Sequence, residues 1–370
     1  MANKICIYAI CKNEMANVEQ WLSNMSEADY IVVLDTGSTD GTFEKLKSDP
    51  RVTRVEQKII KPWRFDVARN ESMKLVPDDA NILLCTDFDE VFEPGWGKII
   101  RENWAPNITR GHYMYAWSHN EKGIPGDIFV YDKMHTRDYK WIFPVHEVLT
   151  PINPKFKEYI LDCGDKVYLH HLQDKTKERS NYCDLLKLSV KENPENMHCL
   201  MLLAREYLIQ NQPDKARETY LEILKHNDTY ERSQIALETY GRLADLYEDL
   251  DQDINKVMEY CYKFIALDDT YREPYFILAR ALFQRGKYIA AIGLVETAMA
   301  RCTHKYTWIE RAPSWQDEGY ILLGACYLRT NELQKSLENY QKAFDINPSR
   351  KETVDNMIAV IKMISQNSTT

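Results

Sequence analysis

A run of apolar residues ends in three carboxylates at residues 83–90, and this segment carries the clearest sign of chemistry in the chain. It reads Leu-Leu-Cys-Thr-Asp-Phe-Asp-Glu, with Asp87, Asp89 and Glu90 closing it. Neighbouring carboxylates raise each other's pKa values unless a cation compensates them. In an extended segment Asp87 and Asp89 share one face, and two hard oxygen ligands suit Mg²⁺ or Mn²⁺ held together with a phosphate. The alternative is a solvated acidic turn, and the segment alone favours neither.

A second polar segment, residues 35–42, reads Asp-Thr-Gly-Ser-Thr-Asp-Gly-Thr, where a strand is expected to lead into a helix. Backbone N–H groups and the helix dipole at such a turn can face an anion. Gly, Ser and Asp are common in any turn of this kind, so the segment alone does not specify an anion site. Asp35 follows the second predicted strand and Asp87 the fourth, and ligands of such sheets collect beyond the carboxyl ends of the strands. We therefore expect Asp35 and Asp87 to border one site.

The elements that position these residues belong to an α/β domain, which we assign to residues 1–175. Short apolar runs alternate there with polar, helix-like segments, which is typical of a sheet covered by helices. Four strands are predicted at residues 5–10, 30–34, 52–56 and 82–86. Three helices are predicted at residues 16–26, 42–48 and 69–75.

The second half of the chain, residues 176–366, is helical and repetitive. A small residue recurs in similar segments at intervals of 40, 35 and 45 residues, at Ala204, Ala244, Ala279 and Gly324. These segments resemble tetratricopeptide repeats, whose period is about 34 residues, although insertions are needed. A small residue where paired helices cross allows close approach, and the stacked pairs offer a concave surface to a partner. The alternative is a plain helical domain that only packs against the first half or dimerises.

Composition and charge exclude several classes of protein. The 370-residue chain has a net charge of −9 and a pI near 5.6, which makes a nucleic-acid partner unfavourable because the phosphate backbone requires a basic surface. No stretch approaches the roughly 18 apolar residues of a membrane span, and the start lacks the form of a signal peptide. Nine scattered cysteines without a C-x-x-C pair indicate reduced thiols. We expect a cytoplasmic protein.

The segment at residues 35–42 together with Asp87-Phe88-Asp89 resembles the pattern of glycosyltransferase family 2 on a GT-A fold. Residues 65–70, Phe-Asp-Val-Ala-Arg-Asn, are similar to that family's Ala-Arg-Asn segment. Residues 139–147 and 167–174 are similar to segments of bacterial and phage members that carry a C-terminal helical-repeat tail, a layout shared with the glycocin peptide S-glycosyltransferases. The resemblance implies a Rossmann-like mixed-sheet catalytic domain followed by an all-α tetratricopeptide-like solenoid.

The same resemblance implies metal-dependent, inverting transfer of a sugar from a nucleotide donor, preferably a UDP-hexose or UDP-N-acetylhexosamine. A guanidinium fork near the donor can bind a diphosphate bidentately without deprotonating. Thr36 stands where many members have a second Asp. The resemblance therefore specifies the nucleobase of the donor less firmly than it specifies metal binding. The residues that the resemblance assigns to the nucleotide sugar are Asp35, Arg69, Asn70, Asp87 and Phe88.

The metal in this scheme is Mn²⁺ or Mg²⁺, and Asp87 and Asp89 are its implied ligands. A late histidine completes the metal shell in several GT-A enzymes. His170 is the residue that we assign to this position, with His171 as the adjacent alternative.

The acceptor side requires a carboxylate that removes a proton from the attacking group. Glu147 is the preferred base, because it stands between Trp and His residues far in sequence from the donor turn, and Glu90 is its rival. Trp117 and Trp141 are either walls on which a sugar stacks or ordinary core aromatics. The acceptor is a peptide, a protein side chain or a glycan.

Two other functions compete with glycosyl transfer. The first is a binding scaffold, in which the helical repeats recruit a partner, or a second copy of the chain as a homodimer, and the sheet domain is catalytically silent. The second is sugar-nucleotide synthesis on a related fold, which requires a Gly-rich triphosphate loop near the N-terminus. Residues 10–14 contain no glycine, which argues against that activity.

Overall fold

The computed structural model describes residues 3–120, 123–172, 182–226 and 234–367. The chain separates into two compact units, Met1–Pro194 (unit 1) and Glu195–Thr370 (unit 2). The predicted domain boundary between residues 175 and 176 lies outside the described residues.

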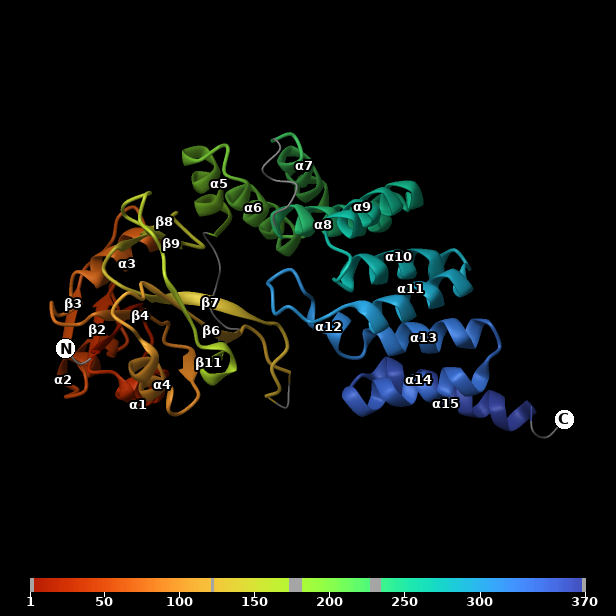
Figure 1. Ribbon diagram of the computed structural model, residues 1–370, viewed down its shortest axis with the longest axis horizontal. Helices are drawn as coiled ribbons and strands as arrows, with labels where there is room; N and C mark the ends of the chain where they lie inside the picture. Colours follow the sequence, from red (N-terminus) through yellow and green to blue (C-terminus); the bar gives the residue numbers. More distant parts are fainter. Residues whose placement is uncertain (1–2, 121–122, 173–181, 227–233, 368–370) are drawn as a thin grey trace. The chain divides into compact units, whose positions relative to one another are not determined.

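Unit 1 contains a mixed sheet, in which nine strands are present within the described residues (Figure 1). The order is β3-β2-β1-β4-β7-β6-β11-β5, with β10 paired to β6. The pairs β1–β2, β1–β4 and β2–β3 are parallel, whereas β7 is antiparallel to both β4 and β6. The strand bounds are β1 Ile5–Cys11, β2 Tyr30–Asp35, β3 Arg54–Gln57, β4 Ile82–Cys85, β5 Glu90–Phe92, β6 Arg110–Ala116, β7 Ile128–His135, β8 Tyr139–Ile142, β9 Val148–Pro151, β10 Ile160–Asp162 and β11 Tyr168–His171.

Two layers cover this sheet, because alternate side chains of a strand point to opposite faces. Ile5, Ile7 and Ala9 of β1 pack in one core with apolar side chains of α1, α2 and α4. Cys6 and Tyr8 pack in a second core with the β8–β9 hairpin. The helices of unit 1 are α1 Val18–Asn24, α2 Thr42–Ser48, α3 Phe65–Met73, α4 Trp96–Asn103 and α5 Tyr182–Glu192, with short 3-10 turns η1 Met25–Glu27 and η2 Gly164–Lys166.

The predicted elements of the first half are present. The four predicted strands coincide with β1 to β4, and their ends differ by one or two residues. The helix predicted at residues 42–48 has those bounds, and the one predicted at residues 16–26 is shorter because its end continues as a 3-10 turn. The third helix begins at Phe65 rather than at Arg69, which places Arg69 one turn inside it. Strands β5 to β11 were not predicted.

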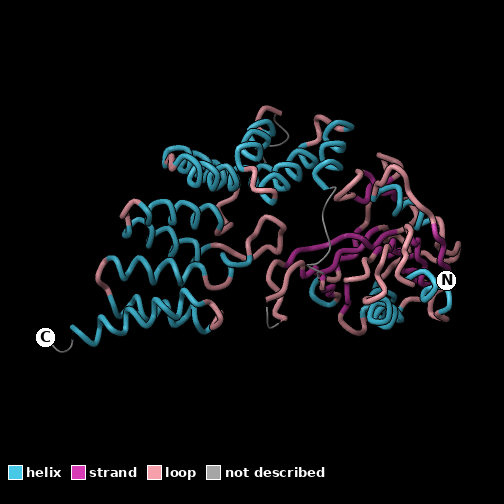
Figure 2. Tube along the Cα trace, turned by 180° about the vertical axis from the view of Figure 1, so that it is seen from behind, coloured by secondary structure: helices cyan, strands magenta, loops and turns pink. Residues whose placement is uncertain are grey.

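Unit 2 is built from antiparallel helix pairs, as the repeat pattern predicted (Figure 2). The pairs are α6/α7, α8/α9, α10/α11 and α13/α14, and α15 packs on α14. No helix in the described ranges is both long and apolar enough to cross a bilayer. The helix bounds are α6 Met197–Ile209, α7 Pro213–Ile223, α8 Gln234–Asp251, α9 Ile254–Leu267, α10 Glu273–Gln284, α11 Tyr288–Arg301, α12 Ala312–Trp315, α13 Glu318–Arg329, α14 Leu333–Ile346 and α15 Lys351–Asn367.

The recurring small residues lie where the paired helices come closest. Ala204, Ala244 and Ala279 are completely buried, and a Cβ atom added to Gly324 would lie 2.9 Å from the Tyr340 ring. The long interval of 45 residues has a simple cause, because the chain between α11 and α13 includes an extra loop and the short helix α12. The predicted close approach of paired helices is therefore confirmed at Gly324, and the three alanines are buried.

Candidate functional site

The carboxyl ends of β2 and β4 lie on either side of β1, at one edge of the parallel part of the sheet. β1 pairs with β2 in the register Cys11↔Asp35 and with β4 in the register Tyr8↔Cys85. Asp35 is the last residue of β2, and Asp87 comes two positions after the end of β4. The two aspartates therefore leave the sheet at the same edge.

Asp35 is buried and holds its own turn together. Its Oδ1 accepts hydrogen bonds from the backbone N–H groups of Gly37 and Ser38 and from Gln57 Nε2, each at 2.9 Å. Its Oδ2 lies 3.4 Å from the Cys11 thiol. Burial opposes ionisation, but these hydrogen bonds lower the pKa of the Asp35 carboxyl. Asp35 thus keeps a negative charge at the strand end and shapes the turn that follows.

Arg69 is the centre of a buried ion cluster. Its Nη2 donates to both carboxylate oxygens of Asp87, at 2.9 and 3.2 Å, and its Nη1 lies 3.0 Å from Cys85 Sγ. Its Nε forms an ion pair with Glu147. The side chain is only 5% exposed, because α3 carries it against the end of β4. The predicted phosphate cation is therefore engaged with two carboxylates of the chain itself.

Lys133 of β7 is a second cation of this cluster that the sequence analysis did not identify. Its Nζ lies 3.2 Å from Asp87 Oδ2 and 3.6 Å from Glu90 Oε1. It is also placed over the Tyr131 ring, 4.8 Å from the centroid. A lysine within a strand-like run of apolar and aromatic residues was the available signal, since such a lysine is rarely buried without a partner.

The two carboxylates that contact Lys133 have opposite pKa shifts. Burial opposes the charge of Asp87, but Arg69 and Lys133 outweigh it and lower the pKa of that carboxyl. Burial raises the pKa of Glu90, which is 1% exposed. The oxygens of Glu90 accept hydrogen bonds from the Asp87 backbone N–H at 2.9 Å and from the Tyr115 hydroxyl at 3.0 Å. Glu90 is thus a buried support for Asp87.

Asp89 is paired with His171, the last residue of β11. His171 Nε2 lies 3.4 Å from Asp89 Oδ2, and its Nδ1 lies 3.3 Å from the Trp117 carbonyl oxygen. Since a carbonyl only accepts, Nδ1 carries the proton of a neutral ring and Nε2 presents a lone pair to the carboxylate. Burial opposes a charge on this ring, but Asp89 raises the pKa of His171. With a neutral ring, the contact between His171 Nε2 and Asp89 Oδ2 would bring two acceptors together. Either a second proton on the ring or a cation between the two side chains removes this repulsion.

This donor set fits a divalent cation. A carboxylate and an imidazole are both ligands of Mn²⁺-like metals, and a backbone carbonyl on the other ring nitrogen is the usual outer partner of a metal-bound histidine. In the described part of the chain, no three His, Cys, Asp or Glu side chains converge on one metal position. A cation held by Asp89 and His171 would take further oxygens from a bound phosphate, as Mg²⁺ commonly does.

His170 lies apart from this pair. Its Nδ1 is 2.9 Å from His119 Nε2, and its Nε2 is 3.3 Å from Glu93 Oε1. Successive side chains of β11 point to opposite faces, so only one of the two histidines can reach Asp89. The structure places His171 there, the alternative of the two, and not His170.

Two further predicted binding residues have structural partners. Phe88 is 4% exposed and stacks on Trp21, with ring centroids 4.2 Å apart, so its side chain belongs to the core. Asn70 clamps β8, since its Nδ2 donates to the Trp141 carbonyl at 2.8 Å and its Oδ1 accepts from the Trp141 N–H at 2.9 Å. Both side chains are therefore engaged within the protein rather than directed at a ligand beside Asp87.

The remaining candidates differ in exposure. Trp141 is 3% exposed and is a core residue, whereas Trp117 is 40% exposed and lies 4.7 Å from the His171 ring. Of the two candidate bases, the Glu147 side chain is 9% exposed and Glu90 is almost fully enclosed. Trp117 is therefore the exposed aromatic candidate, and Glu147 is the less enclosed of the two candidate bases, although it is paired with Arg69.

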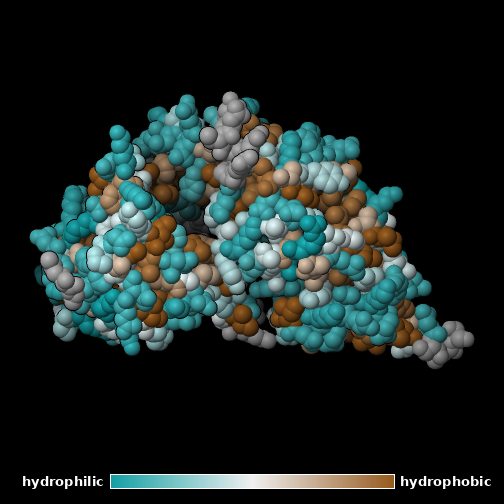
Figure 3. Space-filling view, viewed as in Figure 1, coloured by the Kyte–Doolittle hydropathy of each residue, from teal (hydrophilic) through white to brown (hydrophobic). Residues whose placement is uncertain are grey.

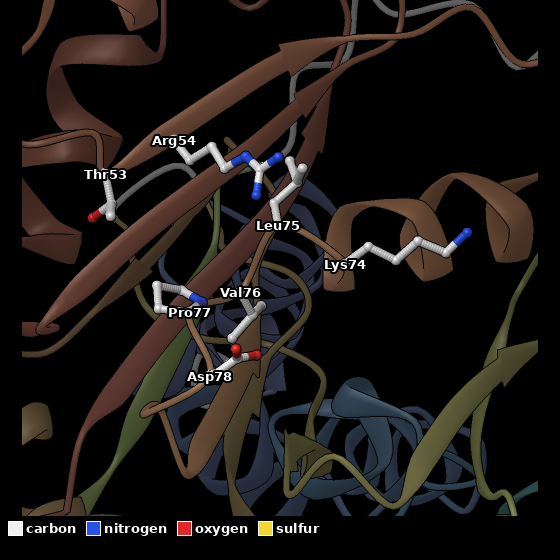
Figure 4. A pocket seen from close by; sticks show the side chains of 7 residues that line it. All are labelled: Thr53, Arg54, Lys74, Leu75, Val76, Pro77 and Asp78. Carbon is white, nitrogen blue, oxygen red and sulfur yellow. The ribbon is translucent and has the colours of Figure 1, made fainter.

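A pocket of about 340 Å³ in unit 1 lies elsewhere (Figure 4). It is lined by residues 53–54, before and at the start of β3, and by residues 74–78, ahead of β4. These are the amino ends of the strands, opposite the ion cluster. Its basic side chains already form ion pairs, Arg54 with Glu56 and Lys74 with Glu71 at 2.6 Å.

In unit 2, the insertion between α11 and α13 packs on the helices that precede it. Ile309 is 3% exposed and lies among apolar side chains of α8 and α9. Trp308 lies under the Arg205 guanidinium of α6, 4.7 Å from its Cζ, and Arg311 pairs with Asp245 of α8 at 2.6 Å. The insertion thus covers part of the surface formed by the first helices of the repeats.

Comparisons with known proteins concern this helical part. Residues 317–350, which form α13 and α14, match the family model described as tetratricopeptide repeat. A search of curated protein sequences finds no match. Among solved structures, MamA is 17% identical, with 47% of this chain and 85% of that chain covered and a TM-score of 0.36.

Two further tetratricopeptide repeat proteins are similar to this chain. One from Thermus thermophilus is 17% identical over 49% of this chain and 90% of that chain, with a TM-score of 0.39. YrrB, described as having an unusual peptide-binding site, is 12% identical over 50% of this chain and 85% of that chain, with a TM-score of 0.37. All these scores are below 0.5 and carry no argument about this chain. The family match shows one tetratricopeptide repeat at residues 317–350, and the helix pairs around it form a helical region of similar architecture.

Proposed function

We propose that unit 1 is a metal-dependent glycosyltransferase of the GT-A type, which moves a sugar from a nucleotide donor to a peptide, protein or glycan acceptor. The observation that carries this proposal is the Asp89–His171 pair beside the Asp87–Arg69–Lys133 cluster, at the carboxyl edge of parallel strands. A carboxylate beside an imidazole nitrogen can hold a divalent cation, and a cation at this edge is suited to a diphosphate.

The buried charges support a donor site of fixed geometry. Arg69 and Lys133 keep Asp87 ionised and restrict its rotation, while Glu90 holds the Asp87 backbone from the other side. A charged side chain that is already held in place needs little reorganisation when a ligand binds, and this is the main advantage of such clusters in enzymes. UDP-hexose or UDP-N-acetylhexosamine remains the preferred donor.

In the proposed reaction, the acceptor atom attacks the anomeric carbon while the bond from that carbon to the diphosphate oxygen breaks. The leaving oxygen takes the electron pair, and a divalent cation, when bound, would neutralise the charge that develops there. The acceptor proton goes to a carboxylate. Glu147 is the proposed base, because its side chain, although paired with Arg69, is less enclosed than that of Glu90.

The test compares UDP-sugar hydrolysis with Mn²⁺ and calorimetric binding of Mn²⁺ with UDP. We expect Asp89→Ala and His171→Ala to weaken metal-dependent UDP binding by at least about tenfold, since each removes a metal ligand. His170→Ala is the matched control and retains binding, because that ring faces His119. Asp165→Ala, on an exposed turn, controls for loss of surface charge. Equal turnover and equal binding in the native protein and the Asp89→Ala variant would refute the proposal.

A second candidate function is a partner-binding scaffold with a catalytically silent sheet unit. The tetratricopeptide match at residues 317–350 favours it, and this family evidence supports partner binding more directly than it supports catalysis. Titration of UDP and Mn²⁺ into the native protein separates the two. Saturable heat of binding supports the enzyme, whereas no binding by a folded native protein supports the scaffold.

A further inference from the structure

The helix α15, which follows the matched repeat, is apolar on two sides. Val360 is completely buried and packs with Leu333 and Tyr340 of α14. Ile358 and Ile361 lie on another side of α15, and each is 46% exposed. In the space-filling view, hydrophobic atoms interrupt the hydrophilic surface near the end of this helix (Figure 3). A helix that buries one apolar face and exposes a second is typical of an interaction surface.

The exposed side of α15 carries a symmetric arrangement of charge. Asp355, Ile358, Ala359 and Lys362 are all exposed and follow the helical spacing i, i+3, i+4 and i+7, so they form one continuous stripe. Asp355 and Lys362 lie at equal distances in sequence from the midpoint between Ile358 and Ala359. No ion pair joins either charge to another residue in the described part of unit 2. Asp355 and Lys362 therefore flank an apolar centre, and the exposed Lys351 and Glu352 lie one turn before Asp355.

We propose that this stripe is the contact surface for a second copy of the chain, with α15 packed antiparallel on α15 of the partner. A two-fold axis between Ile358 and Ala359 places Asp355 opposite the partner's Lys362, and Lys362 opposite the partner's Asp355. A two-fold interface requires such a self-complementary surface, because every contact between residues of the two copies occurs twice, once on each side of the axis. The inference does not depend on the proposed enzymatic activity.

The chemistry of the stripe explains why a second copy fits better than an unrelated helix. Ala359 leaves room at the crossing point for the larger Ile358 side chain of the other helix, as in packed helix pairs. Burial of the isoleucines supplies the driving force, while the charges set orientation and partner choice. A parallel arrangement would bring Asp355 towards a second Asp355, which is unfavourable.

The first experiment measures the mass of the full chain by sedimentation and light scattering over about a hundredfold range of concentration. We expect the native protein to approach twice its 43.5 kDa mass at high concentration and to dissociate on dilution. Ile358→Glu should remain a monomer. Ile289→Glu, at a position that is 70% exposed on α11, is the matched control and should behave as the native protein does. A native protein that is a monomer throughout, or an Ile358→Glu variant that still dimerises, would overturn the proposal.

The second experiment exchanges the charges. We expect D355K and K362D each to weaken dimerisation by about tenfold, because like charges then meet twice across the axis. The double variant D355K/K362D restores the opposite pairing and should dimerise within about threefold of the native protein. An equimolar mixture of the two single variants should form a mixed dimer for the same reason. Failure of both the double variant and the mixture to associate, with unchanged helical circular dichroism, would contradict this arrangement.

Discussion

The two units use ion pairs in different ways. In unit 1, the pairs join residues from unrelated parts of the chain, such as Arg69 with Glu147, 78 residues away, and Lys133 with Asp87, 46 residues away. In unit 2, several ion pairs between helices have separations close to the repeat length. They are 33 for Arg205–Glu238, 35 for Arg280–Asp245, 37 for Arg285–Glu248 and 38 for Arg280–Glu318.

This difference distinguishes a candidate functional site in unit 1 from ion pairs that stabilise the helical repeats of unit 2. Regular separations mean that each repeat is joined to the next, which is how a stacked array gains its stability. In unit 1, ion pairs between residues far apart in sequence lie together at one sheet edge. Burying charges is unfavourable unless they are paired. The cluster in unit 1 is therefore the stronger candidate for chemistry, and the ion pairs in unit 2 are chiefly structural.

The largest expected effect comes from removing the centre of the unit 1 cluster. Arg69→Met leaves Glu147 without its buried partner, while Asp87 retains Lys133 at 3.2 Å, and should destabilise the protein by about 3–5 kcal/mol. Arg205→Met in unit 2 should cost only about 1 kcal/mol, because Glu238 retains Arg242 at 2.9 Å. Urea denaturation followed by circular dichroism measures both. Equal losses would remove the distinction between the two kinds of ion pair.

The next effect concerns pH and a buried carboxyl of unit 2. Burial raises the pKa of Glu273 to about 7, and its Oε1 accepts a hydrogen bond from the Arg311 backbone N–H at 2.9 Å. Because the folded pKa lies above the unfolded value, this carboxyl contributes stability below about pH 4.5 that is lost as the pH rises through 7. Glu273→Gln should abolish this loss.

The size of that effect is about 2–3 kcal/mol between pH 5 and pH 8, estimated from the shift in pKa. Thermal denaturation of the native protein and of Glu273→Gln across this range tests it. The two proteins should differ least at pH 5, and Glu273→Gln should be the more stable at pH 8. A native protein whose stability is independent of pH over this interval would argue against a buried, protonated Glu273.

A smaller effect tests the close helix contact in the matched repeat. Gly324→Ala places a Cβ 2.9 Å from the Tyr340 ring and should cost about 1–3 kcal/mol through overpacking. Gly293→Ala on α11 is the control, since no atom lies within 4 Å of its added Cβ, and it should stabilise the helix by up to about 1 kcal/mol. Opposite shifts in Tm are the expected result, and shifts of the same sign would count against the role assigned to Gly324.

The smallest effect is expected at an exposed ion pair of the helical surface. Lys263 donates to Glu259 at 2.7 Å, and both side chains are more than a third exposed. Lys263→Ala should change stability by no more than about 0.5 kcal/mol, because exposed pairs are screened by water and salt. A loss as large as that of Arg69→Met, measured in the same urea titration, would show that surface charges matter more in unit 2 than burial predicts.

The parts of the fold that local pattern controls could be predicted from the sequence. The runs before Asp35 and Asp87 are apolar and short, and both prove to be buried strands. The repeats were visible because Ala204 and its counterparts must be small wherever two helices touch. In both cases the constraint acts on neighbouring residues, so a single sequence displays it.

The parts that depend on strand register could not be predicted. The choice between His170 and His171 follows from which face of β11 turns towards Asp89, and a shift of one residue would reverse it. Lys133 approaches Asp87 only because β7 pairs with β4 in the antiparallel direction. Phe88 was assigned to a ligand by its place in the motif, but its ring packs on Trp21.

The sequence by itself determined the two-part organisation, the acidic strand ends and the repeat spacing, because periodic burial and local charge are properties of short segments. Only the tertiary structure decided which charges meet. It joined Arg69 and Lys133 to Asp87, enclosed Glu90, and directed His171 towards Asp89. The physical reason is that such contacts depend on how strands distant in sequence are ordered and registered, and the low exposure of Arg69 and Lys133 strengthens their pairing with Asp87.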